Sequence, residues 1–172
     1  MKQKFIDYYM DIAERTAKLS HAKRLQVGSV IVKEHKILAT GYNGTPTGWD
    51  NNCEDKVWDS GAGGWLDSLE IEQLYPYEEY HEQAERMVRY KLKTKPEVLH
   101  SEMNSLMKVA KSNESTDGAV LFCTHAPCLD CAKAIYQSGI KVVYYKNSYR
   151  NDDGLNFLQI CGVDVYKLTN SL

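Results

Sequence analysis

The second half of the chain alternates helical and strand-like segments, and this order limits the folds that the chain can adopt. Apolar residues recur at helical spacing in three segments, and a short run rich in β-branched residues follows each of them. Gly139 and Gly162 mark the ends of two predicted helices. Such units form parallel strands joined by right-handed crossovers. The predicted order is helix 100–111, strand 119–124, helix 127–138, strand 140–146, helix 153–161 and strand 163–168.

The N-terminal part adds one helix and two strands. Residues 5–20 repeat apolar positions at helical spacing, which predicts a first helix. Residues 27–32 and 36–40 are rich in β-branched residues and lie close together, which predicts an antiparallel hairpin. With the three later strands, the hairpin makes a five-stranded mixed sheet covered by helices. The expected fold class is therefore α/β, a three-layer α/β/α sandwich.

Residues 49–96 interrupt this order and differ in composition. They contain all three tryptophans of the chain, a glycine-rich break at 61–64 and many acidic residues. Pro76 begins a predicted helix that runs to about Lys93, supported by acid–base pairs at i,i+4 spacing. We therefore expect one domain, residues 1–172, with a helical insertion at about 49–96.

Charge and cysteine content argue against several classes of partner. The net charge is −2 and the pI is about 6.2, whereas proteins that follow a nucleic-acid backbone usually carry a basic stripe. The basic cluster at 21–24 could hold one phosphate group, but it gives poor support for a polynucleotide. There is no apolar run long enough for a membrane span, no signal-peptide pattern, and an odd number of cysteines, five. We expect a cytoplasmic protein with free thiols and no membrane partner.

Two short motifs point to a metal centre. One is H-x-E, at His100 and Glu102, and the other is P-C-x-x-C, at Pro127, Cys128 and Cys131. One imidazole and two thiolates give Zn²⁺ three ligands and leave a fourth position for water, which is the catalytic arrangement. Pro127 fits the first position of a helix, whose dipole favours thiolates in its first turn. The alternative is that the two cysteines belong to the core or to a structural zinc site.

The combined pattern resembles the signature of the zinc-dependent nucleobase deaminases. In that chemistry Glu102 is the general acid–base residue. It takes a proton from water, passes it to N3 of cytosine and protonates the departing amine, while the water oxygen attacks C4. The products are uracil and ammonia.

Five stretches of the chain resemble the deoxycytidylate (dCMP) deaminase family of phages and eukaryotes. The resemblance implies a cytidine-deaminase-like sandwich that hydrolyses dCMP to dUMP and ammonia and so supplies dUMP for dTTP synthesis. The alternatives are dCTP, free cytidine or a base in RNA as substrate, or a non-catalytic nucleotide-binding regulator, against which the intact Glu102 argues. The matching stretches are 27–32, 41–48, 100–104, 127–133 and 137–141.

The chain departs from the family pattern at the insertion, which shows no resemblance, and at two further points. Ser101 stands where the family usually has alanine, a change that leaves backbone roles intact. Some phage members hold a second, structural zinc. Cys53 and His81 are candidate remnants of such a site, but a full ligand set is not evident and we expect none.

The same resemblance implies substrate contacts. Asn43 would bind the sugar hydroxyl, and the backbone of Ser101 would address the base. Arg24 would bind the 5′-phosphate, with Tyr149 closing over it. Three of these residues have an ordinary alternative. Asn43 could be a turn residue, Arg24 a solvated surface charge, and Tyr149 an exposed tyrosine without a special role. The base and sugar pocket would be lined by Thr124, His125 and Ala126.

Relatives of this kind are commonly homohexamers, activated by dCTP and inhibited by dTTP at a subunit interface. The resemblance therefore implies an effector site, with Mg²⁺ accompanying the triphosphate. Gly44 and Gly48 would let the loop backbone approach a ligand, and Lys111 would supply charge where related phage enzymes have arginine. Alternatively, Lys111 only complements the dipole of its helix.

Overall fold

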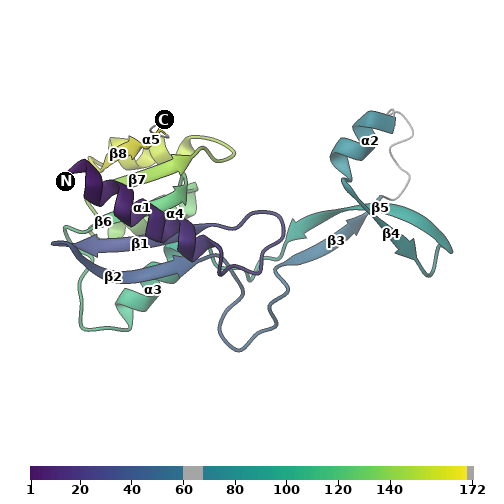
Figure 1. The fold of residues 1–172 in the computed structure, drawn as a ribbon, viewed down its shortest axis with the longest axis horizontal. Helices are drawn as coiled ribbons and strands as arrows, with labels where there is room; N and C mark the ends of the chain where they lie inside the picture. Colours follow the sequence, from purple (N-terminus) through teal and green to yellow (C-terminus); the bar gives the residue numbers. More distant parts are fainter. Residues whose placement is uncertain (60–67, 170–172) are drawn as a thin grey trace.

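The main body of the protein is a five-stranded mixed sheet with helices on both faces (Figure 1). The computed structural model describes residues 1–59 and 68–169, so the glycine-rich break at 61–64 lies outside the described residues. The strand order is β2-β1-β6-β7-β8; β1 is antiparallel to β2 and β6, and β6, β7 and β8 are parallel. The predicted α/β class is confirmed. The strands are β1 (Gly28–Lys33), β2 (Lys36–Tyr42), β6 (Val120–His125), β7 (Val142–Asn147) and β8 (Asp164–Lys167).

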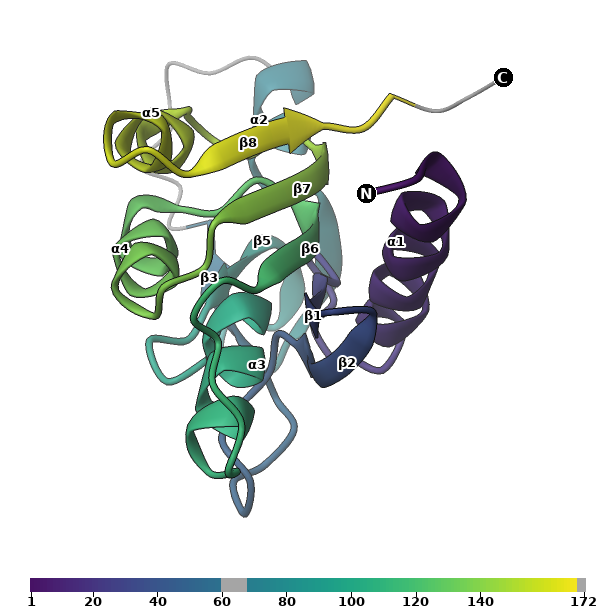
Figure 2. The ribbon, with the colours of Figure 1, turned by 90° about the vertical axis from the view of Figure 1, so that its left-hand side faces the viewer.

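Helices cover both faces of this sheet, as the view along the sheet shows (Figure 2). The four helices predicted outside the insertion are present, with ends shifted by no more than three residues. None of the helices in the described part of the chain is long and apolar enough to cross a membrane. The first face carries α1 (Gln3–Ala17), and the second carries α3 (Ser101–Ala110), α4 (Leu129–Gln137) and α5 (Asp153–Ile160).

Strand β6 is buried on both faces, which makes it the centre of the core. Leu121 and Phe122 are adjacent, so their side chains point to opposite faces of the sheet, and both are fully buried. Phe122 packs against Tyr9 of α1, with ring centroids 5.3 Å apart. Leu121 joins a larger apolar cluster with Ile135 of α4 and Leu158 of α5. A strand buried on both sides needs a nearly continuous apolar run, as β6 has.

A separate three-stranded antiparallel sheet, of order β3-β5-β4, projects away from the main body (Figure 1). We call residues 54–94 the arm. Among the described residues of the arm, Val88 is the only buried hydrophobic side chain. The arm consists of β3 (Glu54–Trp58), α2 (Ser68–Leu74), β4 (Tyr77–His81) and β5 (Arg86–Thr94).

The prediction of a helix from Pro76 to Lys93 is wrong, because this stretch forms the hairpin of β4 and β5. Val88, Tyr90 and Leu92 alternate with charged residues, which is the period of a strand. Glu85 has a φ of 50° in the turn between the strands. Acid–base pairs at i,i+4 spacing contribute only a few tenths of a kcal/mol, which is too little to outweigh cross-strand pairing. The insertion is thus mainly β-structure, with one short helix.

Candidate active site

Two helix N-termini bring the three predicted metal ligands together. His100 is the N-cap residue of α3, Cys128 is the N-cap residue of α4, and Cys131 lies in the first turn of α4. The Nδ1 atom of His100 is 3.4 Å from the Sγ atoms of both Cys128 and Cys131. All three ligand atoms lie within 4.8 Å of one another. One imidazole and two thiols at this separation fit Zn²⁺, which takes nitrogen and sulfur ligands at about 2.0–2.3 Å.

The start of α4 differs from the expectation that Pro127 would open the helix. The helix begins at Leu129, because Cys128 is extended, with φ −71° and ψ 168°. Pro127 therefore precedes the N-cap and is fully buried. Gly154 packs closely against it; a Cβ atom at Gly154 would lie 2.1 Å from the Pro127 carbonyl oxygen. The extended Cys128 leaves its sulfur facing the cavity instead of the helix flank.

The thiols influence each other strongly. Hydrogen bonding from Cys131, with help from His100, lowers the pKa of the Cys128 thiol to about 4. The same pairing, together with burial, raises the pKa of Cys131, and the contact with Cys128 raises the pKa of His100. A divalent cation would stabilise both sulfurs as thiolates.

Glu102 lies beside this cluster in a buried setting. It is 4% exposed, and burial raises its pKa. The hydroxyl of Ser101, the residue that replaces the usual alanine, donates to Glu102 Oε2 at 2.9 Å. The carbonyl of Ser101 accepts a hydrogen bond from Ser29 Oγ at 2.8 Å. Gly41 is needed next to it, since a Cβ atom there would lie 2.2 Å from the same carbonyl oxygen. Strands β1 and β2 therefore hold the start of α3.

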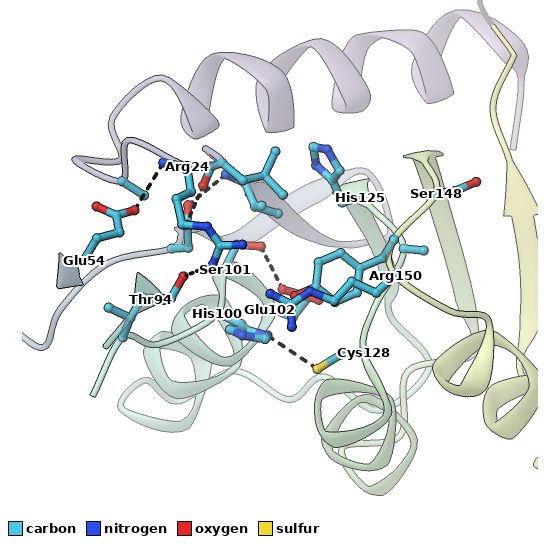
Figure 3. A pocket seen from close by; sticks show the side chains of 17 residues that line it. Arg24, Glu54, Thr94, His100, Ser101, Glu102, His125, Cys128, Ser148 and Arg150 are labelled. Carbon is cyan, nitrogen blue, oxygen red and sulfur yellow. Dashed lines mark hydrogen bonds between the residues drawn. The ribbon is translucent and has the colours of Figure 1, made fainter. Parts of the chain in front are cut away.

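A cavity of about 410 Å³ opens above the cluster and is lined in part by His100, Glu102 and Cys128 (Figure 3). Thr124, which was predicted to line it, lies behind the wall: it is buried, and its hydroxyl accepts a hydrogen bond from the Gly28 N–H at 3.1 Å. Burial lowers the pKa of His125. The predicted substrate contacts that do line the cavity are Arg24, Asn43, Ser101, His125, Ala126 and Tyr149.

The amide of Asn43 holds two loops together. Its Oδ1 accepts from the Val27 N–H at 2.8 Å, and its Nδ2 donates to the Leu25 carbonyl at 2.9 Å. This is the loop role that was the ordinary alternative for Asn43. Because the same residue lines the cavity, it connects the shape of the loop to the shape of the pocket.

Four polar or charged residues that the sequence did not reveal also line the cavity: Glu54, Thr94, Ser148 and Arg150. The guanidinium group of Arg150 lies 5.5 Å from the ring centroid of Tyr149. Within residues 1–59 and 68–169, no carboxylate lies within ion-pair distance of this arginine. Arg150 directly follows Tyr149, a predicted substrate contact, and this position could have suggested Arg150 as a cavity residue. Glu54 and Thr94 belong to the arm, which carries no recognisable motif.

The three candidate effector residues differ in their settings. Gly44 is buried, and its backbone forms a bridge with Leu99, with N–O distances of 3.1 and 2.9 Å. Gly48 is exposed, with φ 94°. Lys111 is exposed at the C-cap of α3, at the other end of that helix from His100.

The two candidates for a structural zinc site also lie apart in sequence and setting. Cys53 is buried in a small cluster with Ala22 and Val98. His81, on β4, packs edge-on against Trp58, with ring centroids 4.6 Å apart.

Comparison with known proteins places this geometry in a family. The family model for the cytidine and deoxycytidylate deaminase zinc-binding region matches residues 3–147. The deoxycytidylate deaminase of enterobacteria phage T4 is 30% identical, and the alignment covers 92% of this chain and 87% of that protein. The human deoxycytidylate deaminase is 32% identical over 86% of this chain and 67% of its own length.

A solved structure agrees with these relatives. The crystal structure of dCMP deaminase from the cyanophage S-TIM5, in complex with dCMP and dUMP, is 40% identical to this chain. It superimposes with a TM-score of 0.73 and covers 98% of this chain and 99% of its own. The zinc-binding family match spans both helix N-termini that carry the ligands, and the relatives span nearly the whole chain. The protein is therefore an enzyme of the cytidine and deoxycytidylate deaminase family, in its phage-type dCMP deaminase group.

Proposed function

We propose that the enzyme hydrolyses dCMP to dUMP and ammonia and so provides dUMP for dTTP synthesis. The observation that carries this proposal is a buried carboxylate, Glu102, beside a three-ligand metal cluster at a cavity of about 410 Å³. A cavity of this size suits a nucleotide. The cyanophage relative, 40% identical, has been crystallised with dCMP and dUMP.

Zn²⁺ held by His100, Cys128 and Cys131 would supply Lewis acidity, which lowers the pKa of water and makes it a nucleophile near neutral pH. Glu102 accepts the proton of that water and delivers it to N3 of cytosine. The water oxygen forms a bond to C4, and the bond from C4 to the amine then breaks. Glu102 carries the second proton to the departing amine, which leaves as ammonia. Acid–base help of this kind contributes about 10²–10⁴-fold.

The charges around the cavity favour a substrate with one phosphate group. Arg24 and Arg150 line it from loops on different sides, and their side chains point into the same space (Figure 3). Neither has a carboxylate within ion-pair distance in the described part of the chain. Two such guanidinium groups match the charge and geometry of a phosphate dianion. Tyr149 lies under the guanidinium of Arg150 and closes the same side.

Two measurements test the proposal. Loss of cytosine absorbance is followed with deoxycytidine, dCMP, dCTP and CMP side by side, and dCMP should have the highest kcat/KM. A preference for dCTP, or equal rates with and without a phosphate group, contradicts the substrate assignment. Metal analysis should find one zinc per chain, and its loss on replacing Cys131 with serine would agree with the ligand set. A protein without zinc contradicts the mechanism.

Regulation belongs to the same proposal. We expect a homohexamer that magnesium dCTP activates and dTTP inhibits, with Gly44 and Gly48 near the effector. The bridge between Gly44 and Leu99 supports a route to the metal site, because Leu99 precedes His100. Lys111 would add charge for the triphosphate, or serve only the helix dipole.

The test is the dCMP rate curve with and without each nucleotide. A coupling of about 1–3 kcal/mol corresponds to a 5–150-fold change in apparent affinity. A hyperbolic curve that neither nucleotide alters, beyond competition at the active site, contradicts regulation and leaves the chemistry intact.

A further inference from the structure

Two residues of the arm contact Arg24, one through its backbone and one through its guanidinium group (Figure 3). The carboxylate of Glu54, at the start of β3, accepts hydrogen bonds from the backbone N–H groups of Lys23 and Arg24, at 3.1 and 3.3 Å. The hydroxyl of Thr94, at the end of β5, accepts a hydrogen bond from Arg24 Nη1 at 3.0 Å. The arm thus holds both ends of this arginine.

Glu54 and Thr94 act from one place in the arm. They face each other directly across the β3–β5 ladder, so their side chains lie on the same face of the arm's sheet. Glu54 is only 5% exposed, and a buried carboxylate requires hydrogen-bond donors. The N–H groups of residues 23 and 24 supply them, which fixes the base of the arm to the loop before β1.

The chemistry of the two contacts leaves the charge of Arg24 available. A hydroxyl acceptor orients the guanidinium group but does not neutralise it, whereas a carboxylate would. Arginine has five N–H donors, and the contact with Thr94 uses one of them. Holding a long side chain before the ligand arrives reduces the entropy lost on binding. A positioned, uncompensated cation at a cavity is suited to bind an anion.

We propose that the Glu54–Thr94 pair positions Arg24 for the phosphate group, so that the base of the arm sets the preference for a nucleoside monophosphate over a nucleoside. This rests on the proposed function, in which Arg24 binds the 5′-phosphate of dCMP. Neither residue touches the reacting atoms. The insertion is thereby part of substrate selection and not only a surface addition.

The first test is Thr94→Val, which removes the acceptor at nearly constant volume. The ratio of kcat/KM for dCMP to that for deoxycytidine should fall about 5- to 10-fold, mainly through KM, which is the scale of one ordinary intramolecular hydrogen bond. Thr94→Ser keeps the acceptor and should retain most of the preference for dCMP over deoxycytidine. Zinc content and melting temperature are measured for both variants to separate positioning from folding.

A double-mutant cycle shows whether Thr94 acts through Arg24. In the Arg24→Ala background, Thr94→Val should cause no further fall in the ratio, because the group that it positions is gone. Equal losses for dCMP and deoxycytidine, or a full effect in the Arg24→Ala background, would overturn the proposal. A rise in dCMP efficiency would also overturn it, since the hydrogen bond would then hold Arg24 away from the phosphate.

Glu54 offers an independent pair of variants. Glu54→Gln keeps an oxygen for the two N–H donors and should retain most of the dCMP preference, whereas Glu54→Ala should lose it. If the unmodified enzyme does not prefer dCMP to deoxycytidine, the proposed function itself is wrong. If it does and neither Thr94→Val nor Glu54→Ala changes the ratio, only the inference about the arm is wrong.

Discussion

The main body and the arm of this enzyme are stabilised in different ways. In the body, helices cover both faces of the sheet and β6 is buried on both sides, with Leu121 and Phe122 fully inaccessible. In the described part of the arm, Val88 is the only buried hydrophobic residue, and Tyr80 and Met87 are more than half exposed. Cross-strand contacts hold the arm, such as the stacked rings of Tyr77 and Tyr90 with centroids 5.4 Å apart.

This difference between body and arm corresponds to two proposed roles in the site, catalysis and substrate selection. The candidate metal ligands and Glu102 come from the starts of α3 and α4, next to the packed core. Arg24 lies at the junction, where the arm meets the body. On the proposed assignments, the reacting groups belong to the densely packed body. Substrate selection would then belong to the boundary between body and arm.

The largest effect is expected at Glu102, which lies in the main body beside the candidate metal ligands. Glu102→Gln should lower kcat by roughly 10²–10⁴-fold, because the amide cannot accept the proton of water while its size hardly changes. The variant should still bind zinc, which metal analysis checks. It should also still bind nucleotide, which a dUMP binding measurement checks. If the variant kept a tenth of the normal kcat, the proton transfer would have to be assigned to another group.

A smaller effect, selective for the phosphate, is expected at the junction. Arg24→Ala should weaken kcat/KM for dCMP about 10- to 100-fold more than for deoxycytidine, because a charge-assisted contact is lost. Arg15→Ala removes an exposed arginine outside the cavity and serves as the control. Equal losses on both substrates would move the phosphate site, with Lys23 as the first alternative.

The same substitution in the two regions compares their packing directly. Val143→Ala, at a fully buried position of β7, should lower the free energy of unfolding by about 2 kcal/mol, since it leaves a cavity in a dense core. Val88→Ala in the arm should cost about 1 kcal/mol or less.

Thermal unfolding with zinc present measures the first change, and amide hydrogen exchange in β4 and β5 measures the second. If the two substitutions had equal effects on global unfolding, the arm would be part of the same cooperative unit as the body.

The smallest effect is expected at the position where the chain departs from its family. Ser101→Ala removes the hydroxyl that donates to Glu102 Oε2 and should change kcat by no more than about tenfold, the worth of one hydrogen bond. Steady-state kinetics with dCMP measures it. A loss above a hundredfold would mean that this hydroxyl takes a direct part in proton transfer.

Much of the body was predictable from the sequence because its constraints are local. Helical spacing, β-branched runs and the helix-ending Gly139 and Gly162 gave the order of elements, and both glycines have positive φ. The arm was mispredicted because its residues 76–93 carry i,i+4 charge pairs as well as a strand alternation, and the partner strand β3 decides between them. Pro127 was placed two positions too far into its helix, because Cys128 is extended and the helix begins only at Leu129, where Gly154 packs closely against Pro127 and Cys128.

The sequence alone determined the family and the α/β class and identified the candidate metal ligands with Glu102, because these depend on residue types at short, fixed spacing such as H-x-E and P-C-x-x-C. Tertiary structure alone decided which residues line the cavity. It placed Thr124 behind the cavity wall and brought Glu54, Thr94 and Arg150 into it. Contacts between residues 30 to 70 positions apart, such as those of Arg24 with Glu54 and Thr94, leave no local pattern. They exist only because the strands of the arm pair at its base.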